Sequence, residues 1–289
     1  MWSSSVKLIH SAAELQELLD YERAKGNTIG FVPTMGALHE GHLSLVKLAQ
    51  EASDVVVVSV YVNPLQFGPA EDFAKYPRTL EIDAALLEAN KVDFLFAPPV
   101  EEVYPNGPEI TQRAGVTGST FEGASRPGHF DGMLTVVNRL MEIVQPDSVV
   151  FGEKDAQQVF IVRKLIGARF RNCSFIEGPT LREASGLAMS SRNRYLSAEQ
   201  RTNSEQLYRH LNEMKQELEA GAKVSEVLTK HSAGLEADAK AKLEYLAVID
   251  PQIFRPVDDN YQGPAKIIVA AKVGEVRLID NLNVKAINA

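Results

Sequence analysis

The sequence predicts an α/β protein, with a doubly wound parallel sheet followed by a smaller α+β unit. Short runs of Val, Ile and Phe alternate with longer amphipathic segments up to about residue 180. Several of these runs are apolar without polar alternation, which is typical of parallel strands buried on both faces. After Pro179 two long helical segments precede three strands, and this order favours a separate α+β unit.

The strands of the first unit are short and bounded by polar or Gly-containing segments. The clearest is the β-branched run over residues 54–62, which favours a central position in the sheet. Parallel neighbours need crossover connections, and a helix-length segment follows most of these runs. The predicted strands cover residues 28–32, 54–62, 92–97, 148–151 and 173–177.

The helices of this unit are predicted from capping signals and from apolar periodicity. Ser11 and Glu14 have capping-box spacing, leucines at helical spacing follow them, and Gly26 ends the segment. Apolar residues recur at three- and four-residue steps over residues 131–145. The other predicted helices cover residues 42–52, 79–90 and 156–168.

The second unit begins with a loop rich in Ser, Arg and Gly over residues 182–194. Two helices are expected next, and then three strands. The short turn at residues 272–274 predicts that the last two strands form a hairpin. We therefore predict two domains, residues 1–180 and 181–289, with helices over 198–220 and 224–239 and strands over 243–249, 265–271 and 275–282.

Composition excludes several classes of protein. The formal net charge is −8, which disfavours binding of a nucleic-acid backbone. The longest apolar run is too short to span a bilayer, and the first ten residues lack the apolar core of a signal peptide. The one cysteine, Cys173, cannot form an internal disulfide and fits a reducing compartment. We expect a cytoplasmic protein in which Cys173 is a structural residue.

Polar segments follow four of the predicted strands or lie at the domain boundary. In open α/β sheets ligands bind outside the carboxyl ends of the strands, so these segments are expected to meet at one edge. Their composition is specific in each case. They are residues 33–41, 63–78, 152–158 and 181–193.

The segment 33–42 contains an H-x-G-H element, His39 to His42, at the start of a predicted helix. The free N–H groups and the dipole of a helix N-terminus attract phosphate, and two imidazoles there could add donors. Two other interpretations remain open, namely solvent-facing histidines on an ordinary turn and a metal site. Two histidines without a third ligand are too few for a typical zinc site.

Three further segments carry candidate ligands. Lys154 follows a strand and could neutralise a phosphate, Asp155 could cap the helix or hold a ribose hydroxyl, and Gln158 lies one turn later. Residues 189–193 offer two hydroxyls and a guanidinium, which suit a phosphate clamp or form a Ser-rich linker. In residues 61–68 the neutral amides of Asn63 and Gln66 suit a small hydroxy acid, although a structured turn would have the same composition.

Five long motifs together resemble the pantothenate synthetase (pantoate–β-alanine ligase) family over almost the whole chain. They are P-T-M-G-A-L-H-E-G-H (33–42), Y-V-N-P-L-Q-F-G (61–68), E-G-A-S-R-P-G-H-F-D-G (122–132), F-G-E-K-D-A-Q-Q (151–158) and G-L-A-M-S-S-R-N-R-Y-L-S (186–197). The resemblance implies a Rossmann-like fold of the H-x-G-H nucleotidyltransferase type. It also implies a K-M-S-K-S-like signature at Met189 to Arg192, here with arginine in place of the frequent lysine.

The resemblance further implies ATP-dependent condensation of pantoate with β-alanine through a pantoyl adenylate, releasing pyrophosphate and then AMP. Magnesium would accompany the triphosphate, with no protein ligand identified. A homodimer and a C-terminal domain that acts as a lid are implied as well. Departures from the common family pattern at Leu181, Ala156 and Ser185 lie beside the motif residues and are expected to affect fine packing and affinity rather than the reaction.

Matched motif by motif, the resemblance assigns residues to three roles. Catalysis is expected of His42, His39, Lys154 and Arg192, with His42 as a cationic donor to phosphate. Pantoate and β-alanine are expected at Gln66, Gln158 and Asn63. The other four histidines are expected to be structural or at the surface. The predicted ATP site is Pro33, Thr34, Met35, Gly36, Ala37, Leu38, His39, Glu40, Gly41, His42, Gly152, Glu153, Lys154, Asp155, Leu181, Met189, Ser190, Ser191 and Arg192.

Three rival functions can be distinguished from this one. A nucleotidyltransferase acting on a phosphorylated acceptor would need more cationic residues than Asn63 and Gln66 provide. A tRNA synthetase is disfavoured by the acidic charge and by the lack of a basic RNA-binding appendage. A non-catalytic nucleotide-binding regulator would bind ATP but release no AMP in the presence of pantoate and β-alanine.

Overall fold

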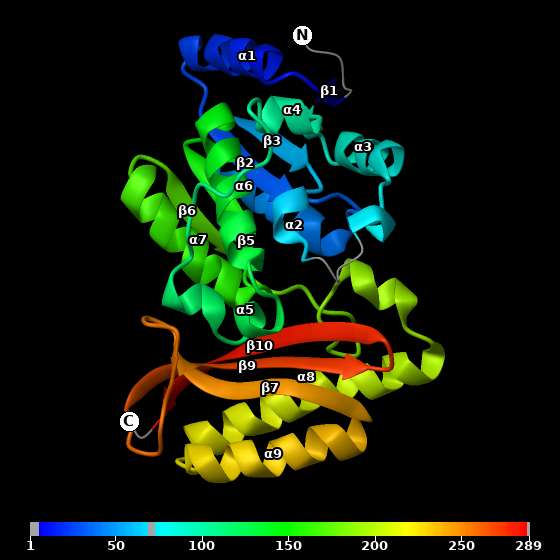
Figure 1. The fold of residues 1–289 in the computed structure, drawn as a ribbon, viewed down its shortest axis with the longest axis vertical. Coiled ribbons are helices and arrows are strands. Elements are labelled where there is room, and N and C mark those ends of the chain that lie inside the picture. The colour runs from blue at the N-terminus through cyan, green and yellow to red at the C-terminus, as the bar shows by residue number, and fades with distance from the viewer. Residues whose placement is uncertain (1–5, 69–72, 288–289) are drawn as a thin grey trace. The chain divides into compact units, whose positions relative to one another are not determined.

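The computed structural model describes residues 6–68 and 73–287, and these form two compact units (Figure 1). The N-terminal unit comprises Met1–Glu153 and Ile161–Pro179, and the C-terminal unit comprises Lys154–Phe160 and Thr180–Ala289. The predicted ranges 1–180 and 181–289 assign residues 154–160 to the first domain instead. Those ranges also include residues 1–5, 69–72 and 288–289, which lie outside the described part of the chain.

The N-terminal unit contains a six-stranded sheet in which all neighbouring strands are parallel, as predicted. The strand order is β1-β4-β3-β2-β5-β6. The sequence prediction missed the three-residue edge strand β1, because it is too short to show a pattern. The strands are β1 (Lys7–Ile9), β2 (Ile29–Thr34), β3 (Val55–Val60), β4 (Phe94–Phe96), β5 (Ser148–Gly152) and β6 (Ser174–Gly178).

Helices cover both faces of this sheet. The chain adds strands in one direction from β2 to β4 and in the other from β4 to β6, and right-handed crossovers then place the connecting helices on opposite faces. Helices α2 and α3 bury Leu43, Val46 and Leu87 against Val32, Val58 and other strand residues on one face. The helices are α1 (Ala12–Ala24), α2 (Glu40–Ala52), α3 (Leu80–Ala89), α4 (Val100–Val103), α5 (Glu122–Ser125), α6 (His129–Val144) and α7 (Ala156–Arg169).

The strand order creates a switch point between β2 and β5. Strand β2 pairs with β3 on one side and with β5 on the other, and the chain leaves β2 and β5 in opposite directions along the sheet. Such a reversal opens a crevice at the carboxyl ends of the two strands, which is where open α/β sheets bind ligands. The segments at this point are residues 35–39, which follow β2, and Gly152 at the end of β5.

The C-terminal unit contains an antiparallel sheet of order β10-β9-β7-β8 with two helices packed on it (Figure 1). The predicted hairpin is present, because β9 and β10 pair around a turn at Gly274, whose φ is +59°. The structure adds the short strand β8. The elements are α8 (Ala198–Glu219), α9 (Val224–Asp238), β7 (Ala241–Asp250), β8 (Arg255–Pro256), β9 (Gly263–Val273) and β10 (Val276–Ile287).

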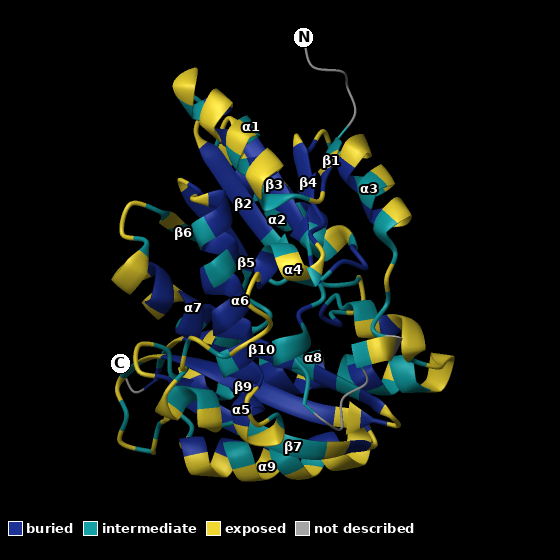
Figure 2. Cartoon of the chain, turned by 45° about the horizontal axis from the view of Figure 1, so that its top comes forward, coloured by how far each residue is buried: buried dark blue, intermediate teal, exposed yellow. Residues whose placement is uncertain are grey.

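Burial follows the expected pattern. Figure 2 shows β2 and β3 buried along most of their length, while α1 and α3 expose residues on their outer faces. Among residues 6–68 and 73–287, no helix combines the length and apolar content needed to cross a membrane. The predicted structural status of Cys173 agrees with its environment, since burial raises the pKa of its thiol to about 12 and keeps it protonated.

Candidate active site

The turn after β2 contains two residues with positive φ. Gly36 has a φ of +82°, and an added Cβ there would come within 2.9 Å of Val60. Ala37 has a φ of +52°, a conformation that costs a non-glycine residue about 1 kcal/mol. Thr34 accepts a hydrogen bond from the Gly36 amide at 3.1 Å. The conformation of this turn is therefore specified by its residues and their contacts.

Asp83 of α3 fixes this turn. Its carboxylate accepts hydrogen bonds from the backbone N–H groups of Ala37 at 3.0 Å and Leu38 at 2.8 Å. Thr79 donates a third at 3.1 Å, and Asp83 is only 1% exposed. Hydrogen bonds to a buried charge are stronger than neutral ones, so Asp83 rigidly ties α3 to the residues that precede the first histidine. The sequence carried no signal for this residue.

His39 and His42 form a reciprocal cap at the start of α2. The Nδ1 atom of His39 accepts from the Gly41 amide at 3.1 Å, and the Nδ1 atom of His42 accepts from the His39 amide at 3.3 Å. The helix thus begins at Glu40, two residues earlier than predicted. The ring centroids lie 4.1 Å apart.

This cap determines where each imidazole carries its proton. An Nδ1 atom that accepts a hydrogen bond is unprotonated, so a neutral ring must carry its proton on Nε2. Both rings can then act as Nε2–H donors while their Nδ1 atoms hold the helix end. The cap therefore requires neutral imidazoles, whereas the sequence had predicted that His42 is cationic.

Asn63 and Gln66 lie together at the short helix η1 (Pro64–Gln66), which follows β3. Asn63 has no exposed surface, and its amide nitrogen donates to the Gln66 side-chain oxygen at 3.2 Å and to the Gly132 carbonyl at 3.0 Å. Its oxygen accepts from the Leu65 amide and from the Tyr104 hydroxyl. All four hydrogen-bonding positions of the Asn63 amide are thus used within the protein.

The Gln66 side chain is oriented by these contacts. Its amide oxygen accepts from Asn63, and its amide nitrogen lies 2.9 Å from the Met35 sulfur. Because a thioether is a weak acceptor, a ligand oxygen could replace that contact at little cost. Met35 and Gln66 come from segments 31 residues apart, so the structure brings together two of the predicted site segments.

Residues of helix α6 contact the backbone at Gln66. The Nδ1 atom of His129 lies 2.9 Å from the Gln66 carbonyl oxygen, and its Nε2 atom lies 3.1 Å from Arg126. Gly132 allows the close approach, because an added Cβ would lie 2.0 Å from the Leu65 carbonyl oxygen. The expectation that His129 is structural fits these contacts, and they show that it supports a candidate ligand residue.

Two tyrosines line the same region. Burial raises the pKa of Tyr61 and of Tyr104 above the ordinary range, so both hydroxyls stay protonated. Tyr104 donates to Asn63 at 2.8 Å. The Tyr61 hydroxyl is buried without a hydrogen-bond partner among the described residues. Each tyrosine can therefore act only as a neutral polar group here.

In the C-terminal unit, Lys154 lies at the start of the segment that leads into α7. Its side chain is 19% exposed, and its ammonium lies 3.8 Å from Asp155, too far for a hydrogen bond. The Asn281 side chain donates to the Lys154 carbonyl at 2.9 Å and so attaches this segment to β10. Gln158 is partly buried within the same segment.

The loop before α8 is braced by a buried ion pair. Arg182 binds Asp280 through two hydrogen bonds of 2.7 and 2.9 Å, and its guanidinium lies 4.2 Å from the centre of the Tyr208 ring. Paired and stacked in this way, Arg182 holds the start of the loop on β10.

The predicted phosphate clamp occupies the end of this loop. Ser190 caps the short helix η4 (Ser191–Tyr195) by accepting from the Arg192 amide at 3.2 Å. Asn193, which is buried, donates to Glu183 and to the Ala188 carbonyl and fixes the loop from inside. Arg192 is exposed, and Met189, Ser190 and Ser191 are partly exposed, so these side chains are accessible to a ligand.

The structure thus gathers the predicted residues into two groups. In the N-terminal unit these are the segment 33–42 with Asn63 and Gln66, and Gly152 and Glu153 at the end of β5. In the C-terminal unit they are residues 154–158 with the loop 181–192. The supporting residues that the sequence did not reveal are Asp83, Tyr104, Arg182, Asp280 and Asn281.

Comparison with known proteins identifies the family. The profile described as Pantoate-beta-alanine ligase matches residues 7–283. A pantothenate synthetase of Leifsonia xyli subsp. xyli is 49% identical over 259 residues, which cover 89% of each chain. One of Thermus thermophilus is 46% identical over 282 residues, covering 96% of this chain and 99% of its own.

Solved structures give the same result. A crystal structure of pantothenate synthetase from Thermus thermophilus superposes with a TM-score of 0.89, at 46% identity, over 97% of this chain and 100% of its own. Pantoate-beta-alanine ligase from Francisella tularensis, complexed with beta-gamma ATP and beta-alanine, gives a TM-score of 0.78 at 35% identity, over 96% and 97% of the two chains. With the H-x-G-H turn and its supporting contacts, these matches show that the chain belongs to the pantoate-beta-alanine ligase family.

Proposed function

We propose that this protein condenses pantoate with β-alanine in an ATP-dependent reaction, giving pantothenate, AMP and pyrophosphate. The pantoate carboxylate attacks the α-phosphorus of ATP, and pyrophosphate leaves. The β-alanine amine then attacks the carbonyl carbon of pantoyl adenylate, and AMP leaves. Adenylation is needed because an unactivated carboxylate has no adequate leaving group. Family membership supports the overall reaction, and the observation that carries the site assignment is the histidine-capped turn after β2.

We assign ATP binding to the residues predicted from the sequence. In the N-terminal unit the rigid turn and the two Nε2–H donors at the start of α2 suit phosphate oxygens, since a helix end adds its own positive potential. In the C-terminal unit Lys154 and Arg192 supply positive charge, and Ser190 and Ser191 supply hydroxyls. Their roles are electrostatic, because adenylyl transfer requires stabilisation of charge that develops on the phosphates.

We assign pantoate binding to Gln66 and Gln158, with Gln66 also contacting β-alanine. The fixed orientation of the Gln66 amide supports this role. Asn63 was predicted to touch substrate directly, but a side chain with no exposed surface and a fully used amide has nothing left to offer a ligand. We propose instead that Asn63 is a positioning residue for Gln66.

The proposed reaction also requires magnesium. Asp83 accepts three hydrogen bonds that hold the turn and the start of α3, so we do not assign it to Mg²⁺. The ion would enter as the magnesium salt of ATP, held mainly by phosphate and water. We also propose that the protein is a homodimer in the cytoplasm and that its C-terminal unit closes over bound ATP.

The proposed reaction is tested by isotope exchange. Purified protein with pantoate, MgATP and labelled pyrophosphate is expected to incorporate label into ATP without β-alanine, because the first step is reversible on its own. Omitting pantoate provides the control and is expected to abolish exchange. Pantothenate formation without any exchange would contradict a free pantoyl adenylate, and absence of both would contradict the assigned function.

A separate prediction concerns Asp83. Replacing it with asparagine places an amide N–H₂ where a carboxylate oxygen accepts a backbone N–H, so the turn must shift. We expect a loss of about 1–3 kcal/mol in unfolding free energy and a KM for ATP raised about tenfold. Urea denaturation and steady-state kinetics measure the two effects.

Glu81→Gln provides the matched control, because it makes the same change on an exposed residue of the same helix. It is expected to leave both the unfolding free energy and the KM for ATP unchanged. An Asp83→Asn variant with native stability and native KM would show that the carboxylate does not fix the turn.

A further inference from the structure

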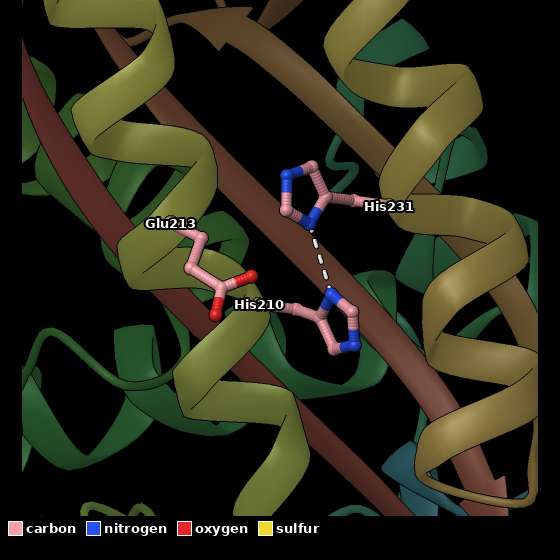
Figure 3. A group of neighbouring side chains, drawn as sticks. All are labelled: His210, Glu213 and His231. Carbon is pink, nitrogen blue, oxygen red and sulfur yellow. Dashed lines mark hydrogen bonds between the residues drawn. The ribbon is translucent and has the colours of Figure 1, made fainter.

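Two buried histidines face each other within the helical layer of the C-terminal unit. His210 of α8 is 5% exposed and His231 of α9 is 1% exposed. Their Nδ1 atoms lie 2.9 Å apart, and Glu213 comes from the next turn of α8 (Figure 3). One ligand atom from each of the three residues lies within 4.8 Å of the others. None of the three belongs to the residues assigned to ATP or pantoate.

The helices are shaped to hold this pair. An added Cβ on Gly234 would lie 2.5 Å from Cε1 of His210, so the absence of a side chain at 234 makes room for the ring. His210 and Glu213 are three residues apart on α8 and therefore share a face. The same three-residue spacing, in the reverse order Glu-x-x-His, holds metal ions in bundles whose other ligands come from neighbouring helices.

The outer nitrogen of each ring faces a carboxylate. The Nε2 atom of His210 lies 3.4 Å from an Asp238 oxygen, and the Nε2 atom of His231 lies 3.2 Å from a Glu217 oxygen. Metal-bound histidines usually donate their second N–H to a carboxylate, which fixes the tautomer with the other nitrogen free for the metal. Both rings have this second partner, and both direct Nδ1 to the same point.

Without a metal, the two neutral histidines form a chain of hydrogen bonds in one direction. Glu217 can only accept, so His231 donates from Nε2 and its Nδ1 accepts a hydrogen bond from the Nδ1–H of His210. That leaves Nε2 of neutral His210 unprotonated and facing the Asp238 carboxylate, and within the described part of the chain its donor is Arg209, at 3.5 Å.

A divalent transition metal removes this mismatch. With both protons on Nε2, each ring donates to its carboxylate and both Nδ1 lone pairs become ligands. Zinc binds imidazole nitrogen at about 2.0–2.1 Å, and two such ligands of a tetrahedral ion lie about 3.3 Å apart. The two Nδ1 atoms must therefore separate by about 0.4 Å, and the rings must turn so that both lone pairs meet at the ion. Glu213, partly exposed, completes a His₂Glu set that leaves a position for water.

The surrounding charges are compatible with a cation. Glu213, Glu217 and Asp238 carry negative charge around the pair, against Arg209 and Lys230. Arg209 pairs with both Glu213 and Asp238, so it can release Glu213 and keep Asp238. We propose that His210, Glu213 and His231 form a binding site for Zn²⁺ or a similar divalent transition metal, which clips α8 to α9.

The test is metal binding to the full-length protein after removal of metals with a chelator. Calorimetric titration with Zn²⁺ is expected to show one site per chain, and Co²⁺ at that site is expected to give the visible absorption of a tetrahedral complex. His231→Ala is expected to abolish binding. Glu213→Gln is expected to weaken it at least tenfold, and Asp238→Asn about 10–100-fold through the outer shell.

Two variants serve as controls. Glu205→Gln makes the same change as Glu213→Gln on a partly buried residue of α8 and is expected to keep native affinity. His42→Gln is expected to keep the site as well, since it alters a different histidine pair. Because Glu213 is not buried, its variant tests the proposal even if His231→Ala fails to fold.

Three results would overturn the proposal. They are no stoichiometric binding of Zn²⁺, equal affinity in the native protein and in Glu213→Gln, and loss of binding in His42→Gln alone. These outcomes are independent of the proposed ligase function, because metal binding is measured without pantoate, β-alanine or ATP.

Discussion

Replacing Lys154 with alanine is expected to lower the rate of pantoate-dependent ATP–pyrophosphate exchange about 10²–10³-fold, the range seen when one pre-organised electrostatic contact to a transition state is removed. The Lys154 side chain is 19% exposed, and its ammonium lies 3.8 Å from the Asp155 carboxylate. A cation so weakly paired retains most of its capacity to stabilise charge on a phosphate. Its backbone is fixed by Asn281, so losing the side chain should not displace the segment.

Matched variants separate charge from folding. Lys164→Ala removes an exposed lysine from α7, the helix that follows Lys154, and is expected to leave the exchange rate unchanged. Lys154→Arg keeps the charge but changes its shape, so partial activity is expected. The unfolding midpoint of Lys154→Ala should equal that of the native protein. Native exchange in Lys154→Ala would remove this residue from the phosphate-binding set.

His42→Gln is expected to reduce exchange by a similar 10²–10³-fold while keeping the stability of the protein. Glutamine at this third helical position can still accept from the His39 amide, as glutamine does in an ordinary capping box. It lacks the Nε2–H that we propose donates to phosphate. Exchange kinetics and thermal unfolding on the same samples separate these two roles of His42.

His42→Ala provides the comparison, because it removes both roles. It is expected to lose the same activity and, in addition, about 1 kcal/mol of unfolding free energy through loss of the cap. Lys47→Gln, a change at an exposed residue of α2 itself, should alter neither. Equal activity of His42→Gln and the native protein would show that His42 serves the helix end alone.

The fold was largely predictable because strand burial and helix periodicity are local signals. The run Val55–Val58 and the hairpin around Gly274 could be placed from a few neighbouring residues. The predicted helix boundaries were less accurate where a capping side chain determines the first residue of the helix. Histidine is not a favoured N-cap, so its residue type did not indicate that His39 would cap α2 and that the helix would begin at Glu40.

The sequence indicated candidate site residues but not the contacts that hold them. Family motifs contain the residues proposed to meet ligand, but their support comes from distant positions. Asp83 reaches the turn from 45–46 residues away, and Asp280 reaches Arg182 across 98 residues. Such contacts depend on tertiary packing, and no local pattern marks an aspartate that will accept backbone N–H groups. Asn63 illustrates the opposite error, since a polar residue in a site motif is fully buried.

The contact between Gly132 and the Leu65 carbonyl has a consequence for how mutations will distribute in this protein. A methyl group at 132 would push on the peptide that precedes Gln66, although position 132 lies within a helix. Alanine, elsewhere the most helix-favouring residue, should therefore be selected against at this position. A saturation-mutagenesis screen scored by growth would then place Gly132 among the positions as sensitive as the substrate-binding residues. A forecast from helix propensity alone would wrongly class Gly132→Ala as a harmless substitution.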